Sequence, residues 1–320
     1  MTRSESPGAL LAAPIRRHLP TVLVVSGIHA LALVLLIAGR AAGAVPVALA
    51  AFAYSRGLIH ALDADHLCMI DGSTRKLLGE GRAPEGVGLA FSLGHSTVVL
   101  LAGLAVASGA TWIRDLVGAE SGAARVLGLI GAGVSAAYLL AVAAANVPNL
   151  GHHHAGRGPM GPWARLLSKP LSRVRHVGHI YLFGILFGLG FDTASTIALL
   201  MMTALATMSG SSPLVLMALP VAFTAAMSLG DSVNANLMLY VYTSAQQATR
   251  ARFNMIVTSI SILCALVVAS STLVEIVAEL TGRPISGPDT TPIAWGLLAL
   301  ALGGCAFALA RRSAHRVRMP

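Results

Sequence analysis

The stretch RGLIHALDADHLCMIDG, residues 56–72, decides how this chain folds, because it sets ionisable groups inside an otherwise apolar run. Five of its ionisable residues, Arg56, His60, Asp63, Asp65 and His66, fall within about three helical turns. An ionisable side chain in hydrocarbon costs about 2.5–3.5 kcal/mol on insertion scales, so such residues usually face an interior path or site. The stretch therefore predicts a functional site inside a membrane bundle, and the competing interpretation is an ion-pair network that only holds helices together.

The composition supports the membrane interpretation. Of the 320 residues, 55% are hydrophobic and only 11% are charged, whereas a soluble domain carries about 25% charged residues. A chain this poor in charge cannot cover a water-facing surface. The net charge of +9 does not predict nucleic-acid binding, because the basic residues flank apolar stretches and do not gather in one patch.

Eight apolar stretches are long enough to cross a bilayer as helices, which requires about 20 residues each. They span residues 19–39, 44–69, 86–108, 122–147, 178–208, 212–243, 253–279 and 291–310. The sequence therefore predicts an all-α polytopic membrane protein with eight transmembrane helices over residues 19–310, flanked by segments 1–18 and 311–320. The longest internal loop, residues 148–177, contains GHHHAG, which is either a weak metal-collecting tract or a solvated loop with no specific role.

The distribution of Lys and Arg orients these helices. Alternate connections hold 17 of the 22 basic residues, the opposite connections hold 4, and Arg56 lies inside the membrane. Because basic loops remain in the cytoplasm, we expect both termini on the cytoplasmic side of a multi-pass cytoplasmic-membrane protein.

The opening stretch has the composition of a metal half-site. On one continuous helix, His60, Asp63 and His66 would share a face within an arc of about 120°, while Asp65 would point away. Imidazole suits divalent nickel, cobalt, zinc and copper, and a carboxylate adds neutralising charge. Arg56 is expected to be a structural counter-ion.

Three further stretches place polar groups in predicted helices. FSLGHSTVVL (91–100) carries His95, which we expect to be another ligand or a gate; GLGFDTAST (188–196) and MSLGDSVNANLM (227–238) follow in the fifth and sixth stretches. The first, fourth, seventh and eighth stretches carry few polar groups. We therefore expect a polar path lined by helices two, three, five and six, with these polar groups along its later part: Asp192, Thr193, Asp231, Ser232 and Asn234.

Together these motifs resemble the nickel/cobalt transporter family of membrane permeases. The residues His60, Asp65 and His66 match a second-helix motif of His, four residues and Asp-His, and FSLGHSTVV, LGFDTA and Asp231-Ser232 follow in the family's order. The resemblance implies an eight-helix permease domain that imports Ni²⁺ or Co²⁺ as its substrate, without a cofactor. It also implies that the second-helix motif is the main metal-recognition element, with Asp63 inside it and His95 as the third-helix histidine.

Two positions depart from the family pattern. Ser195-Thr196 stands where the family usually has Thr-Glu, and Asn234 stands where it usually has Asp. Because two negative charges are missing, we expect weaker attraction for a divalent cation or altered coupling to protons.

Other functions fit the sequence less well. No GxxxxGK[ST] phosphate loop is present, so we expect a secondary permease, and a potential of about 100 mV favours inward movement of a divalent ion by about 4.6 kcal/mol. An efflux protein for the same metals is the main alternative, and the shortness of GHHHAG favours uptake. An intramembrane hydrolase with Zn²⁺ on His60, His66 and His95 lacks support from any HExxH or GxSxG motif, so we do not expect an enzyme.

Overall fold

A computed structural model describes residues 7–39, 45–107, 122–147, 175–189, 194–208, 210–244, 247–283 and, with gaps, 285–299. Within these ranges the long regular elements are α-helices and no strand occurs, which confirms the predicted all-α class. The helices are α1 (Pro7–Gly39), α2 (Val45–His60), α3 (Ala64–Gly79), α4 (Val87–Ala107), α6 (Gly122–Asn146), α8 (Val177–Gly188), α9 (Ala194–Met208), α10 (Pro213–Ser244) and α11 (Gln247–Thr281).

Several of these helices suit a bilayer. Four spans are long and apolar enough to cross one: Arg17–Gly39, Val87–Ala107, Pro213–Tyr240 and Ile262–Thr281. Large apolar side chains on α1 are openly exposed, such as Leu23 at 62% and Val34 at 60%, as expected for a surface that faces lipid. The chain is therefore a membrane protein. Its division into eight spans stays a prediction, because most of the eighth stretch and most of the loop 148–177, including GHHHAG, lie outside the described residues.

The second apolar stretch is not one helix, so that part of the prediction is wrong. Helix α2 ends at His60, residues 61–63 leave the helix, and α3 begins at Ala64. Asp63 is the N-cap residue of α3, with an extended backbone at φ −62° and ψ 143°. Asp is among the residues most favoured at that position, but the Asp63 side chain makes no capping hydrogen bond and contacts Nδ1 of His60 instead. In the fifth stretch the structure describes α8 up to Gly188 and α9 from Ala194, while residues 190–193 lie outside the described residues.

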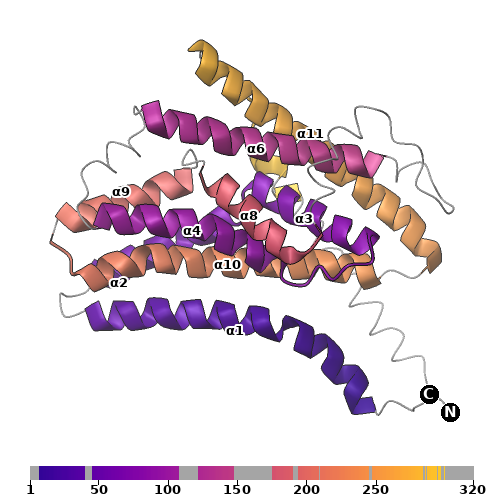
Figure 1. Ribbon diagram of the computed structural model, residues 1–320, viewed down its shortest axis with the longest axis horizontal. Coiled ribbons are helices and arrows are strands. Elements are labelled where there is room, and N and C mark those ends of the chain that lie inside the picture. Colours follow the sequence, from indigo (N-terminus) through magenta and orange to yellow (C-terminus); the bar gives the residue numbers. More distant parts are fainter. Residues whose placement is uncertain are drawn as a thin grey trace.

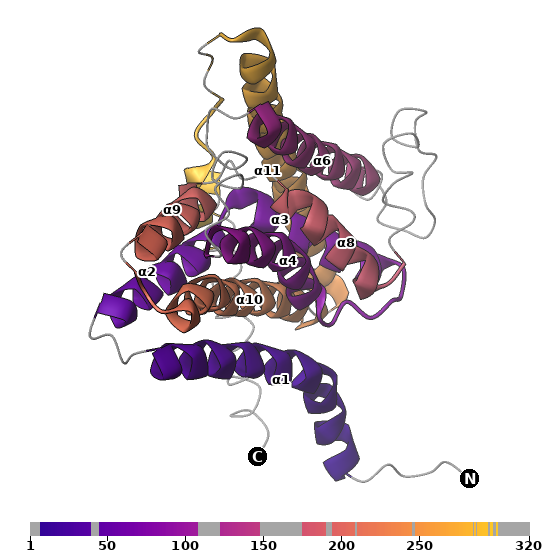
Figure 2. The ribbon, with the colours of Figure 1, turned by 60° about the vertical axis from the view of Figure 1, so that its left-hand side comes forward.

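Helix α10 lies at the centre of the bundle and packs against α1, α2 and α4 (Figures 1 and 2). Helix α4 packs on its other side against α8, and α6 pairs with α11. Glycines permit these close approaches: a Cβ at Gly57 would collide with the carbonyl of Phe223 on α10, and one at Gly94 with the carbonyl of Tyr181 on α8. Small residues let helix backbones approach closely in membranes, so these contacts fix where the polar residues of α2 and α4 lie.

Candidate metal centre

Three histidines from three helices meet in the centre of this bundle. His60 is the last residue of α2, His66 lies in the first turn of α3, and His95 lies midway along α4. One nitrogen from each ring lies within 4.8 Å of the others, and the three residues are 0%, 0% and 3% exposed. The rings of Phe91 and Phe223 pack against His66 and His60, with centroids 4.8 Å and 5.6 Å apart. We refer to the three histidines as the histidine cluster.

The histidines converge for a different reason from the one expected. On a single helix, His60 and His66 would have shared one face, but the break at residues 61–63 separates them onto two helices. The break turns the chain so that their rings come within 4.5 Å, centroid to centroid. The C-terminal end of α2 therefore lies beside the cluster, and the negative end of a helix dipole favours a cation there. Discontinuous helices of this kind form ion sites in membrane transporters.

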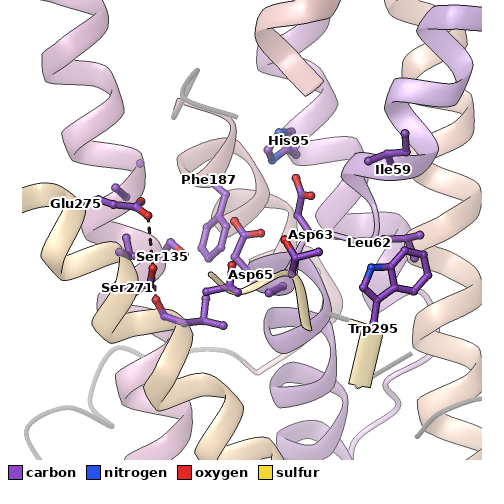
Figure 3. Close-up of a pocket in the computed structure, with 17 residues that line it drawn as sticks. Ile59, Leu62, Asp63, Asp65, His95, Ser135, Phe187, Ser271, Glu275 and Trp295 are labelled. Carbon is purple, nitrogen blue, oxygen red and sulfur yellow. Dashed lines mark hydrogen bonds between the residues drawn. The ribbon is translucent and has the colours of Figure 1, made fainter. Parts of the chain in front are cut away.

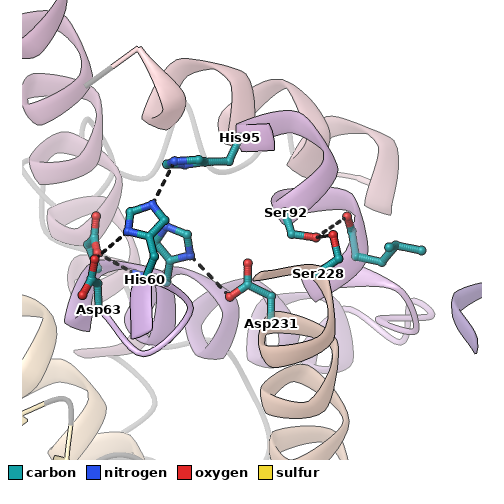
Figure 4. Close-up of polar contacts among 9 residues, drawn as sticks. His60, Asp63, Ser92, His95, Ser228 and Asp231 are labelled. Atoms are coloured by element: carbon teal, nitrogen blue, oxygen red, sulfur yellow. Dashed lines mark hydrogen bonds and ion pairs between the residues drawn. The ribbon is translucent and has the colours of Figure 1, made fainter. Parts of the chain in front are cut away.

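Asp63 orients one imidazole and, through it, the next (Figure 4). Its Oδ2 lies 2.7 Å from Nδ1 of His60, and Nε2 of His60 lies 3.0 Å from Nε2 of His95. An ionised carboxylate can only accept, so Nδ1 of His60 carries the hydrogen and Nε2 of a neutral His60 accepts one from Nε2 of His95. A neutral His95 then keeps its lone pair on Nδ1, which has no hydrogen-bond partner among the described residues.

Asp231 of α10 orients the third imidazole. Its Oδ1 lies 3.3 Å from Nδ1 of His66, and both side chains are fully buried. A carboxylate on one ring nitrogen leaves the other nitrogen directed at a metal, as in many metal sites. We expected Asp231 only as a group along the path, and nothing in the sequence pairs two residues 165 positions apart.

Several polar atoms beside this pair are buried without a hydrogen-bond partner among the described residues. They belong to His66 (Nε2), Asp231 (Oδ2), Ser232 (Oγ) and Asn234 (both amide atoms). Buried polar atoms are normally satisfied, because leaving one unpaired costs about 1–3 kcal/mol. Imidazole nitrogens with nearby carboxylates match the ligand preference of Ni²⁺ and Co²⁺, so the donor set fits such an ion.

The other predicted site residues lie elsewhere. Asp65 is outside the histidine cluster, and its Oδ1 accepts the backbone N–H of His66 at 2.9 Å. Arg56 is half-buried on α2, and its role as a counter-ion stays a prediction. Asp192 and Thr193 lie outside the described residues, while Thr196, at one of the positions that depart from the family pattern, is buried on α9.

A cavity of about 420 Å³ adjoins the histidine cluster (Figure 3). Asp63, Asp65 and His95 line it on one side, while Ser135 of α6 and Glu275 of α11 line it on the other. Helices α6 and α11 come from the fourth and seventh stretches, which we expected to contribute little to a polar path. Ser135 of α6 and Ser271, Thr272 and Glu275 of α11 line this cavity, and the sequence alone gave no sign of that.

Comparison with known proteins places the chain in a family. Residues 46–283 match the model of NicO, described as high-affinity nickel-transport protein. The chain belongs to this family. Among its NicO relatives, it is 36% identical to the high-affinity nickel transport protein of Cupriavidus necator over 72% of this chain and 70% of the relative. It is 31% identical to the nickel transporter NixA of Staphylococcus aureus, over 71% and 72%.

A third relative has a different metal in its name. The cobalt transport protein NhlF of Rhodococcus rhodochrous is 34% identical over 71% of this chain and 70% of its own length. No solved structure matches the chain. The matched range includes α2, α3, α4 and α10, so it covers every residue of the histidine cluster as well as Asp231.

Proposed function

We propose that this protein is a secondary permease that imports Ni²⁺, Co²⁺ or both across the cytoplasmic membrane. One observation carries the proposal: three buried imidazoles, with nitrogens within 4.8 Å of one another, meet at a helix break inside an apolar bundle. Membership of the NicO family supports the same substrate, because its relatives are named nickel and cobalt transporters.

The histidine cluster takes the ion from water and holds it briefly. In this proposal His60, His66 and His95 replace part of the ion's hydration shell. Asp63 holds the His60 ring in position through Nδ1 of His60, and Asp231 does the same for His66. Release toward the cytoplasm would pass the polar residues of the fifth and sixth stretches. The two missing carboxylates of the family pattern lie in these same stretches, so their absence would weaken attraction for the ion along this path.

The proposed membrane arrangement has eight spans with both termini in the cytoplasm. It is supported by the 17-to-4 division of basic residues between alternate connections. In this arrangement α11 runs outward, so its C-terminal end at Thr281 lies near the outer surface. Reporter fusions at residues 82 and 283 test the orientation, because they should report opposite sides of the membrane.

Uptake by intact cells tests the function. In cells that lack their own nickel transporters, the wild-type chain should raise cellular radioactive nickel or cobalt, whereas an exporter would instead raise tolerance to the metal. His60→Ala should abolish uptake, because it removes one imidazole and leaves Asp63 unpaired. His176→Ala is the matched control, since His176 is an exposed histidine outside the cluster. Full uptake by His60→Ala at normal expression would remove the histidine cluster from the mechanism.

A further inference from the structure

The cavity beside the histidine cluster contains acidic groups from opposite walls. Asp63 and Asp65 lie at the break between α2 and α3, and Glu275 lies on α11, outside every motif that resembles the family. In Figure 3, Glu275 and the two aspartates flank Phe187 within one chamber. Carboxylates on facing walls of a cavity produce a negative potential that concentrates cations.

Buried polar atoms in the same cavity point to a ligand independently of the carboxylates. Ser135 is only 6% exposed and lines the cavity, yet its Oγ has no hydrogen-bond partner among the described residues. The same holds for Nδ1 of His95, which keeps a lone pair when the ring is neutral. A hydroxyl and an imidazole lone pair beside carboxylates are suitable partners for a cation that still carries water.

The cavity and the histidine cluster share one residue, His95. His60 and His66 are fully buried and do not line the cavity, whereas Asp63 lines the cavity and contacts His60. Asp63 combines a side chain 35% exposed with its contact to His60. An ion in the cavity would therefore lie beside His95 without contacting His60 or His66.

We infer that this cavity is a second, outer cation site that captures a hydrated divalent ion before the histidine cluster strips it. Glu275 supplies charge from α11, and Ser135 and Nδ1 of His95 accept or coordinate through water. The inference rests on the proposed function for its place in transport, because the cavity then lies toward the outer end of α11. The claim that the cavity binds a cation does not depend on the proposed function, because it rests on the residues that line the cavity.

A tryptophan in the cavity wall gives a direct measure of binding. Trp295 lines the cavity, and the other two tryptophans, Trp112 and Trp163, can be replaced by Phe. Co²⁺ quenches tryptophan fluorescence only at short range, so titrating Co²⁺ into the purified Trp112→Phe/Trp163→Phe protein reports occupancy of the cavity. We expect saturable quenching with one apparent Kd.

Four proteins decide the question in that background: the parent, Glu275→Gln, Glu279→Gln and His66→Ala. Glu279 is the matched control, because it stands one turn further along α11 and pairs with Arg125 at 2.7 Å outside the cavity. Glu275→Gln should raise the apparent Kd about five- to tenfold, the effect of one carboxylate on a divalent ion through water. Glu279→Gln and His66→Ala should leave it within about twofold, because neither Glu279 nor His66 lines the cavity.

Uptake kinetics separate capture from the later steps. Glu275→Gln should raise the KM for nickel uptake by a similar factor and leave the maximal rate unchanged, whereas a structural defect would lower the maximal rate. Equal quenching curves for Glu275→Gln and Glu279→Gln would overturn the outer site, as would loss of all quenching in His66→Ala. Absence of uptake by the parent, with Glu275-dependent quenching intact, would instead refute the proposed import and leave the outer site standing.

Discussion

Replacing Asp231 by Asn should weaken binding of Ni²⁺ to the histidine cluster, although Asp231 need not touch the ion. Its Oδ1 contacts Nδ1 of His66 at 3.3 Å, and both side chains have no exposed surface. The substitution keeps the shape of the side chain but removes its negative charge. It also replaces an atom that only accepts by a group that can donate to the ring.

The expected loss follows from the geometry. An ion on Nε2 of His66 would lie about 7 Å from the carboxylate, and at an effective dielectric constant of about 20 the gross attraction would be about 5 kcal/mol. Much of that attraction is offset by hydration that both charges lose. Carboxylates that orient a ligand imidazole contribute about 10–100-fold to metal affinity, and we expect a loss in that range for Asp231→Asn.

Calorimetric titration of Ni²⁺ into the purified protein measures this loss. Glu80→Gln is the control, because it removes a negative charge at the far end of α3, where Glu80 pairs with Lys76 at 2.8 Å. Adding His66→Ala completes a double-mutant cycle. If Asp231 acts through His66, the loss caused by Asp231→Asn should shrink to about twofold when His66 is absent.

Two results would refute this reasoning. Affinity of Asp231→Asn within twofold of wild type would show that Asp231 neither orients a ligand nor attracts the ion. Additive losses in the cycle would show that Asp231 acts on the ion independently of His66. Elution of each variant as wild type on size-exclusion chromatography ensures that either result concerns binding and not folding.

Two further predictions concern how the helices are held together. Gly94→Ala should destabilise the protein by about 2 kcal/mol or more, because the new Cβ would collide with the Tyr181 carbonyl. A lower apparent Tm than wild type checks this prediction. Gly27→Ala is the control, because a Cβ there meets nothing within 4 Å. Tyr242→Phe should lower the apparent Tm without changing nickel affinity, because its hydroxyl donates to Asp71 and joins α10 to α3 away from the cluster. A change in nickel affinity equal to that of Asp231→Asn would contradict this separation.

The residues of the cluster could be predicted from the sequence, but their geometry could not. Ionisable groups in apolar stretches marked His60, His66 and His95, because hydrocarbon penalises such groups wherever they lie. The assumption of one helix over residues 44–69 was wrong, although Asp63 and Asp65 are typical of an N-cap and a first helical turn. That prediction relied on the length of the apolar stretch. The N-cap residues inside the stretch indicated the position of the break better than its length did.

Contacts between distant helices account for what the sequence did not reveal. The pairing of His66 with Asp231 depends on α10 lying against α3 and α4, which no local pattern specifies. The cavity arises in the same way, because Ser135 and Glu275 lie on two different helices and no local pattern places them together. Each is unremarkable alone, and only the packing of α6 against α11 and α3 brings both beside the break.

The complete burial of His60 and His66 limits how an ion could pass through the histidine cluster. A channel conducts through a continuous wet pore, whereas an ion enclosed by packed side chains leaves only when those side chains part. Such collective motions take microseconds to milliseconds, so each passage waits on a structural cycle. In the proposed import function, the molecule would therefore take up a scarce metal ion by ion, at the expense of flux.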